Sequence, residues 1–173
     1  HNTVLGPALG GTRMWMYQNE QEALTDVLRL SRGMTYKNAL AGLAMGGGKA
    51  VIIADPKTTD REKLFLAFGR FVNSLGGKYY SAEDVGVSTS DIMIANRETP
   101  FVAGTEGKSG DPSPFTALGT FLGIKAAIKH QRGIDSLKGI RVSVQGVGHV
   151  GYYLCQHLHK EGAELVATDI HQA

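Results

Sequence analysis

Apolar residues recur at spacings of three and four between positions 61 and 75, and this pattern predicts an amphipathic helix. Thr59 and Asp60 offer an N-cap for this helix, and Gly76-Gly77 ends it. Because its aromatic residues fall at helical spacing, we expect them in a hydrophobic core and not stacked on a cofactor. The apolar positions are Leu64, Phe65, Phe68, Phe71, Val72 and Leu75.

The remaining pattern alternates between short β-branched runs and helical periodicity. A second helix begins at Glu20, with Leu24, Val27 and Leu28 on one face. Strands that alternate with helices predict an α/β protein. We predict strands at 51–53, 79–81, 140–145 and 165–169, and further helices at 88–97, 115–130 and 147–161. The expected divisions of the chain are 1–114, a connecting helix within 115–134, and 135–173.

Composition narrows the class of protein. Hydrophobic residues make up 42% and charged residues 20%, as in a globular chain with a real core. The formal net charge is +2 with no run of five like charges, so neither a nucleic-acid arm nor a polybasic membrane patch is indicated. The single cysteine, Cys155, excludes an intrachain disulfide and favours a reducing cytoplasm. Because the chain opens at His1 and stops just after a predicted strand, we expect it to be cut at both ends.

Positions 146–151 carry the spacing G-x-G-x-x-G between a predicted strand and a predicted helix. In a dinucleotide-binding unit, such glycines permit a tight turn, close approach of a pyrophosphate, and close helix–strand packing. Asp169 ends the next strand, where a carboxylate would bind ribose hydroxyls and repel a 2′-phosphate. We therefore predict that the motif binds NAD rather than NADP. The alternative to a dinucleotide-binding motif is a strand–turn–helix with incidental glycines. The expected cofactor-binding residues are Gly146, Val147, Gly148, His149, Val150, Gly151 and Asp169.

Two lysines precede this motif, Lys37 and Lys49, and the second follows three glycines at 46–48. A P-loop is excluded, because Leu43 stands where its first glycine belongs and Ala50 supplies no hydroxyl after the lysine. A lysine acts as a base only where burial or a second cation lowers the pKa of its amine. The pair suits one lysine that binds a substrate carboxylate and one that is the general base. Either lysine taken alone is more often a solvated surface residue.

Asp84 lies in the run AEDVG at 82–86. Beside a basic amine this carboxylate would act as a proton shuttle, although the same residue could cap a helix or occupy a turn. No cluster of cysteines and histidines suggests a metal, and His157, His159 and His171 are expected to be solvated.

Six motifs then occur in order along the chain: GPALGGTR at 6–13, MTYKN at 34–38, LxxGGGK at 43–49, VIIADP at 51–56, AEDVG at 82–86 and DPSP at 111–114. With them the chain resembles the glutamate/leucine/phenylalanine/valine dehydrogenase superfamily, and its leucine dehydrogenase branch in particular. The resemblance runs over essentially the whole sequence and joins several independent motifs, so it is specific.

The resemblance implies two domains. A substrate-binding and dimerisation α/β domain would occupy 1–114, and the start of a Rossmann NAD-binding domain, a doubly wound parallel sheet, would occupy 135–173. Lys49 and Asp84 would do the acid–base work, and Thr116 would lie against the nicotinamide. The substrate-binding residues it implies are Leu9, Gly10, Gly11, Met34 and Lys37.

The implied reaction is the NAD-dependent, reversible oxidative deamination of a neutral branched-chain L-amino acid to its 2-oxo acid and ammonia. Apolar Leu9 and Met34 favour a neutral substrate over glutamate, whose side chain needs a cation. A phenylalanine or glutamate dehydrogenase, or a catalytically silent NAD-binding fragment, remains the alternative. We expect a cytoplasmic homo-oligomer with no nucleic-acid or membrane partner, and a chain that is inactive by itself. Two features depart from the family: His149 replaces the usual Asn, and the loop at 105–110 is short.

Overall fold

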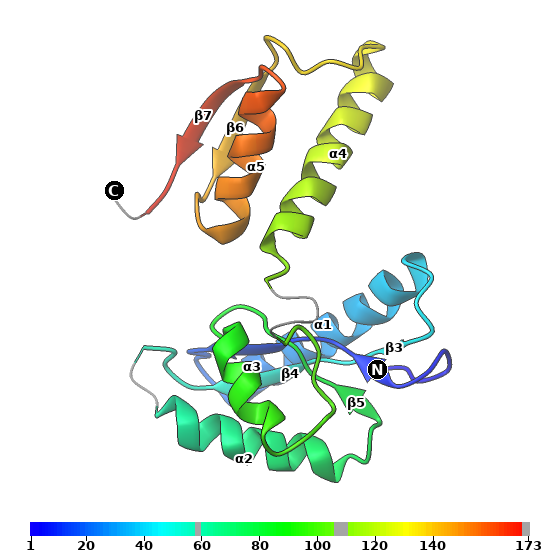
Figure 1. Ribbon diagram of the computed structural model, residues 1–173, viewed down its shortest axis with the longest axis vertical. Coiled ribbons are helices and arrows are strands. Elements are labelled where there is room, and N and C mark those ends of the chain that lie inside the picture. The colour runs from blue at the N-terminus through cyan, green and yellow to red at the C-terminus, as the bar shows by residue number, and fades with distance from the viewer. Residues whose placement is uncertain (58–59, 106–110, 171–173) are drawn as a thin grey trace. The chain divides into compact units, whose positions relative to one another are not determined.

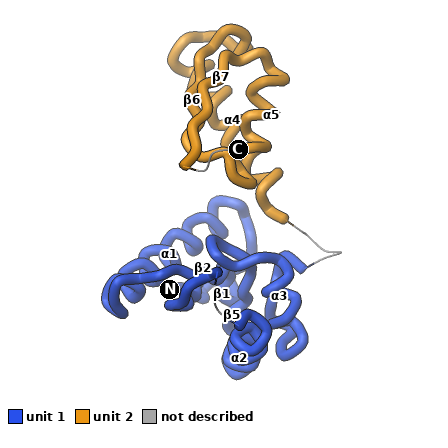
Figure 2. The backbone as a smooth tube through the Cα atoms, turned by 90° about the vertical axis from the view of Figure 1, so that its left-hand side faces the viewer, with its two compact units in different colours: residues 1–110 blue, residues 111–173 orange. Residues whose placement is uncertain are grey.

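The computed structural model describes residues 1–57, 60–105 and 111–170. The chain divides into two compact units, unit 1 at His1–Gly110 and unit 2 at Asp111–Ala173 (Figures 1 and 2). Each unit combines helices with parallel strands, which confirms the predicted α/β class. None of the helices in these described ranges is long and apolar enough to cross a membrane.

Some sequence predictions fall outside those ranges. Thr59, proposed as part of a helix cap, is one of them, and so are most of the loop at 105–110 and His171.

Unit 1 is built on short parallel strands. Strand β1 lies between β3 and β5, and β2 pairs with β4. The strands are β1 (Ala8–Leu9), β2 (Thr12–Trp15), β3 (Gly46–Gly47), β4 (Ala50–Ile53) and β5 (Tyr79–Tyr80). The helices are α1 (Glu20–Leu40), α2 (Arg61–Ser74) and α3 (Thr89–Asn96).

Successive side chains of β2 point to opposite faces of the strands. They therefore contact helices on the two sides of the strand layer. Met14 is fully buried in a cluster with Phe65 of α2 and Ile92 of α3. Its neighbour Arg13 pairs instead with Asp26 of α1. Helix α1 therefore covers one face of the strands and α2 with α3 the other, as Figure 2 shows.

The predicted ends of α2 and α3 are confirmed by their capping contacts. The Asp60 side chain accepts a hydrogen bond from the Lys63 amide at the start of α2. Gly76, just beyond the end of that helix, takes a left-handed φ of 59°, which glycine adopts without strain. Ser88 and Asp91 form a reciprocal capping box at the start of α3.

The inward face of α1 does not coincide with its apolar stripe. Leu24 and Leu28 are 49% and 60% exposed, whereas Ala23, Ser31 and Asn38 are buried. The physical reason is a close approach: a Cβ on Gly47 of β3 would lie 2.0 Å from the amide nitrogen of Thr35. Only small or hydrogen-bonding residues fit a helix face this close to backbone, so the hydrophobic pattern misplaces that face.

Unit 2 contains α4 (Ser113–Arg132), β6 (Arg141–Gln145), α5 (His149–Lys160) and β7 (Glu164–Thr168). Strands β6 and β7 pair in parallel, and the β–α–β order is as predicted. Helix α4 packs against α5, and Figure 1 shows the two side by side. The core consists of Ala117, Leu137, Val144, Leu154, Leu158 and Ala163.

Gly69 allows α2 and α3 to touch, and its substitution tests this packing. A Cβ on Gly69 would lie 2.5 Å from the carbonyl oxygen of Ala95 in α3. We predict that Gly69→Ala lowers the free energy of unfolding by about 1–3 kcal/mol through overpacking. Gly33→Ala, in α1 with open space around it, should instead stabilise by about 0.5–1 kcal/mol. Thermal unfolding midpoints of the two variants measure this, and equal midpoints would contradict the prediction.

Candidate functional site

Glycines bring three backbone segments of unit 1 unusually close together. A Cβ on Gly10 would lie 1.8 Å from the carbonyl oxygen of Gly48, and a Cβ on Gly11 would lie 2.3 Å from that of Glu83. Side chains at Gly10 and Gly11 would therefore push apart the segments that carry Lys49 and Asp84.

Lys49 and Asp84 form the ion pair at the centre of these segments. The distance from Lys49 Nζ to Asp84 Oδ2 is 2.9 Å, and the two side chains are 8% and 23% exposed. Lys49 stands between β3 and β4, while Asp84 follows β5. The Met14 amide donates to the Val85 carbonyl at 2.9 Å, which holds the Asp84 segment along β2. A shielded amine in contact with a carboxylate can exchange protons with a small ligand.

Arg13 is a third charged group at this centre, and sequence reasoning did not identify it. Its Nε lies 3.2 Å from Asp84 Oδ2, and its Nη1 lies 3.1 Å from Asp26 Oδ2. The Tyr17 hydroxyl donates to the same oxygen of Asp26 at 2.6 Å. The only sequence feature that points to Arg13 is its position directly after Gly-Gly-Thr and before an apolar residue of the same strand.

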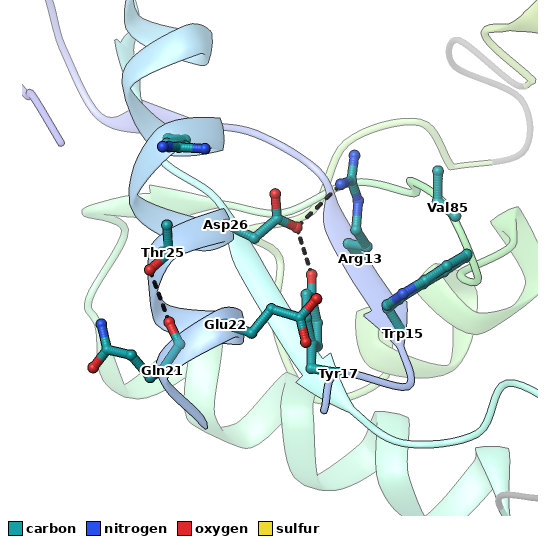
Figure 3. A pocket seen from close by; sticks show the side chains of 9 residues that line it. Arg13, Trp15, Tyr17, Gln21, Glu22, Thr25, Asp26 and Val85 are labelled. Atoms are coloured by element: carbon teal, nitrogen blue, oxygen red, sulfur yellow. Dashed lines mark hydrogen bonds and ion pairs between the residues drawn. The ribbon is translucent and has the colours of Figure 1, made fainter. Parts of the chain in front are cut away.

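Beside this network lies a surface pocket of about 690 Å³. Figure 3 shows Asp26 between Arg13 and Tyr17 on its wall. Neither Lys49 nor Asp84 lines the pocket, which adjoins the ion pair through Arg13 and through Val85, the residue after Asp84. The lining residues are Arg13, Trp15, Tyr17, Gln21, Glu22, Thr25, Asp26, Arg29 and Val85.

The electrostatics of the network keep Asp84 ionised. Burial by itself would raise the pKa of Asp84, but the hydrogen bond and charge of Lys49, together with the charge of Arg13, outweigh it and lower that pKa. Burial would lower the pKa of Arg13, but Asp84 and Asp26 raise it, so the guanidinium stays charged. Burial and the hydrogen bond to Asp26 raise the pKa of Tyr17 to about 12, so this hydroxyl is a donor at neutral pH.

The residues expected to bind the substrate lie at or beside Gly10 and Gly11, with the exception of Lys37. The side chain of Met34 packs on Gly10, with its Cγ 3.0 Å from where a Cβ would stand, and Leu9 is half-buried. Lys37 is exposed in the last turn of α1, and no ion pair of Lys37 is found within the described ranges.

Two further polar residues hold this region together and were not predicted. The side-chain amide of Asn38, the neighbour of Lys37, donates to the carbonyl of Gly46 at 2.6 Å and to that of Leu9 at 3.3 Å. The Tyr79 hydroxyl donates to the Gly10 carbonyl at 2.7 Å. Asn38 thereby fixes the end of α1 that carries Lys37 against the strands.

In unit 2, the glycine-rich turn has the geometry of a phosphate cradle. Gly146 takes a φ of 88°, and a Cβ on Gly151 would lie 2.0 Å from the Gly146 carbonyl oxygen. Gly148 is the N-cap of α5, no side chain caps that helix end, and a Cβ there would enter open space. The residues therefore fit a pyrophosphate at the helix N-terminus.

The expected ribose-binding acid lies beside this turn. Asp169 Oδ2 accepts a hydrogen bond from the Val147 amide at 2.7 Å. A pocket of about 390 Å³ opens at the glycine-rich turn, and Thr116 is exposed near the start of α4. The pocket is lined by Asp111, Val147, Gly148, His149, Tyr152 and Tyr153. Among the residues that the structure describes, no group of three acidic, His or Cys side chains could hold a metal ion.

Comparison with known proteins defines the family. Residues 1–103 match the family model described as "Glu/Leu/Phe/Val dehydrogenase, dimerisation domain". Residues 107–171 match the model described as "Glutamate/Leucine/Phenylalanine/Valine dehydrogenase". The chain therefore belongs to the Glu/Leu/Phe/Val dehydrogenase family, which confirms the resemblance seen in its motifs.

Individual relatives cover the whole chain but extend well beyond it. Leucine dehydrogenase of Geobacillus stearothermophilus is 59% identical over 99% of this chain and 48% of its own length. The crystal structure of L-tryptophan dehydrogenase from Nostoc punctiforme matches with a TM-score of 0.72 and 46% identity, over 99% of this chain and 49% of that one. The crystal structure of hetero-hexameric glutamate dehydrogenase from Thermus thermophilus matches with a TM-score of 0.81 and 27% identity, over 98% of this chain and 44% of that one. The chain thus spans about half the length of these relatives.

The pH dependence of stability tests the ion pair. Because the folded-state pKa of Asp84 lies below its ordinary value of 3.8, the carboxylate stabilises the fold above that pH and loses this effect as the pH falls through the folded pKa. We predict that Asp84→Asn lowers the free energy of unfolding by roughly 1–3 kcal/mol at pH 7, because Lys49 is left buried and unpaired. The difference should shrink below about pH 4.

Denaturant unfolding of both proteins across this pH range measures the effect. Glu62→Gln is the matched control, since it breaks an exposed pair with Arg97 that is worth at most about 1 kcal/mol. An Asp84→Asn variant as stable at pH 7 as Glu62→Gln would rule out the stabilising role.

Proposed function

We propose that the protein containing this chain catalyses the NAD-dependent, reversible oxidative deamination of a neutral branched-chain L-amino acid to its 2-oxo acid and ammonia. The observation that carries this proposal is the shielded contact between Lys49 and Asp84, whose backbone segments are brought together by closely packed glycines. Membership of the Glu/Leu/Phe/Val dehydrogenase family supports it.

Each residue has a distinct part in the proposed reaction. Lys37, with the backbone at Gly10 and Gly11, holds the substrate carboxylate. Bound NAD supplies the acceptor for the hydride that leaves the substrate α-carbon. Lys49 then removes a proton from the water that attacks the resulting iminium carbon. Asp84 carries protons to and from the nitrogen until the C–N bond breaks and ammonia departs.

The preference for a neutral substrate rests on the apolar side chains near Gly10. Leu9 and Met34 offer no charge to a substrate carboxylate side chain, which disfavours glutamate. Relatives named for leucine, valine and tryptophan dehydrogenases agree with this. A phenylalanine or glutamate dehydrogenase is the alternative enzyme. A catalytically silent NAD-binding fragment would have no need of the shielded Lys49–Asp84 pair.

The proposed cofactor is NAD. The open cradle at Gly148 and the uncapped N-terminus of α5 support a bound pyrophosphate, with residues 146–151 around it. Asp169 favours NAD, whose adenine ribose has a free 2′-hydroxyl, because its carboxylate would repel the 2′-phosphate of NADP. Thr116, two residues after the DPSP motif at 111–114, is assigned to the nicotinamide by resemblance to the family.

The proposed assembly is a cytoplasmic homo-oligomer. One matching family model is described as a dimerisation domain, and the Thermus relative is hetero-hexameric. The exposed leucines of α1, Leu24 and Leu28, are apolar surface of the kind that subunit interfaces cover.

The two lysines should give different kinetic defects in the complete protein. We predict that Lys49→Ala lowers kcat about a hundredfold or more and leaves NAD affinity nearly unchanged, because it removes a general base. Lys37→Ala should chiefly raise KM for the amino acid, since it removes a charge-assisted contact to the carboxylate. Steady-state rates with leucine and NAD distinguish the two, and Lys63→Ala, an exposed lysine of α2, is the control. Near-normal turnover of Lys49→Ala would refute its role.

Asp169 should decide the cofactor preference. We expect kcat/KM with NAD to exceed that with NADP by more than about tenfold, because a like-charge contact costs several kcal/mol. Asp169→Asn should narrow this ratio, whereas Asp135→Asn, which removes an exposed carboxylate of the same unit, should not. Comparable efficiencies of the unaltered protein with both cofactors would reject the assignment.

A further inference from the structure

One oxygen of Asp84 contacts two cations of different chemistry. Lys49 Nζ lies 2.9 Å and Arg13 Nε 3.2 Å from Asp84 Oδ2. A lysine can give up its proton in a catalytic cycle, but an arginine guanidinium stays charged in proteins. Only Arg13 can therefore be a permanent counter-ion for this carboxylate.

Arg13 is itself held from a second direction. Its Nη1 contacts Asp26 Oδ2 at 3.1 Å, and Asp26 is fixed by the Tyr17 hydroxyl at 2.6 Å (Figure 3). The guanidinium thus bridges a carboxylate on α1 and one on the loop after β5. A planar group with several donors suits such a bridge, whereas a lysine amine has one centre of charge.

We propose that Arg13 is the positioning residue of the acid–base pair, which keeps Asp84 charged and oriented while Lys49 is without its proton. This proposal rests on the proposed function, because it assigns Arg13 a task in that reaction. Without Arg13, a neutral Lys49 would leave the partly buried carboxylate of Asp84 with no cation from the described residues in contact with Oδ2.

The charges that face Asp84 come from several elements. Among the described residues, Lys49 lies between β3 and β4 and Arg13 lies on β2, and the hydroxyls of Tyr79 and Tyr17 also interact electrostatically with Asp84. Behind Arg13 stands the negative charge of Asp26. Loss of Arg13 removes a fixed positive charge from this set and favours the protonated form of the groups that titrate beside it.

The experiment compares pH profiles of kcat/KM for the complete protein with leucine and NAD. Arg13→Gln should move the acid limb up by about one pH unit and lower kcat at the original optimum about tenfold. Arg13→Lys keeps the charge and should return the acid limb to within about 0.3 pH units of its position in the unaltered protein. Its kcat should recover only in part, since the guanidinium bridge between Asp84 and Asp26 is lost. Asp26→Asn removes a negative charge and should move the limb in the opposite direction.

Arg29→Gln is the matched control, because Arg29 lies one helical turn from Asp26 and lines the same pocket. It should leave both the limb and kcat unchanged. A merely structural role for Arg13 would lower the active fraction without moving the limb, and that result would overturn the proposal. Equal shifts from Arg13→Gln and Arg29→Gln would also overturn it, because they would show a general effect of charge.

The two proposals fail in different ways. If the unaltered protein turns over no amino acid, the proposed function fails and the role of Arg13 falls with it. If that protein is active and the limb of Arg13→Gln stays in place, only the role of Arg13 fails. Should Arg13→Gln not fold, the opposite shift expected for Asp26→Asn decides, and an unmoved limb there would equally refute the proposal.

Discussion

The near-contact of peptide backbones at Gly10, Gly11 and 46–48 is the constraint on which unit 1 depends. A Cβ at Gly10 or Gly46 would lie 2.0 Å or less from a carbonyl oxygen, closer than any side chain tolerates. These glycines let α1, β1, β3 and the segment after β5 converge, and the Lys49–Asp84 contact exists because they do. Packing and chemistry thus have one cause, since the close approach of the backbones and the proximity of the charges both require missing side chains.

Charges alternate outward from this point. Lys49 meets Asp84, Asp84 meets Arg13, and Arg13 meets Asp26. In a region of low exposure, an unpaired charge is costly, so each ion needs its opposite neighbour. The chain of pairs also links the pair to α1, the helix whose last turn carries Lys37. Lys49, the proposed base, is therefore connected through Asp84, Arg13 and Asp26 to the helix that carries Lys37, the proposed carboxylate-binding lysine.

Local signals made part of this structure predictable from sequence. The capping residues Asp60 and Ser88 located α2 and α3, because caps act through contacts three residues away. Arg13 and Asp26 could not be paired in advance, since their contact depends on how α1 lies across β2. The inward face of α1 was missed for the same reason: tight packing on Gly47 selects small and polar residues, and periodicity detects only apolar ones.

In the nucleotide motif, the structure distinguishes the roles of two glycines that the sequence pattern treats alike. By spacing, Gly148 and Gly151 are equivalent members of one motif. A Cβ on Gly151 would strike the Gly146 carbonyl, so that glycine is required by the fold itself, whereas Gly148 faces open space and is required only by something that binds there. Asp169 already contacts the Val147 amide, so the acid is aligned with the turn by the chain's own hydrogen bonding. A ligand that bridges Gly148 and Asp169 would therefore meet a turn already set by Gly146 and Gly151, and would lose little free energy in ordering it.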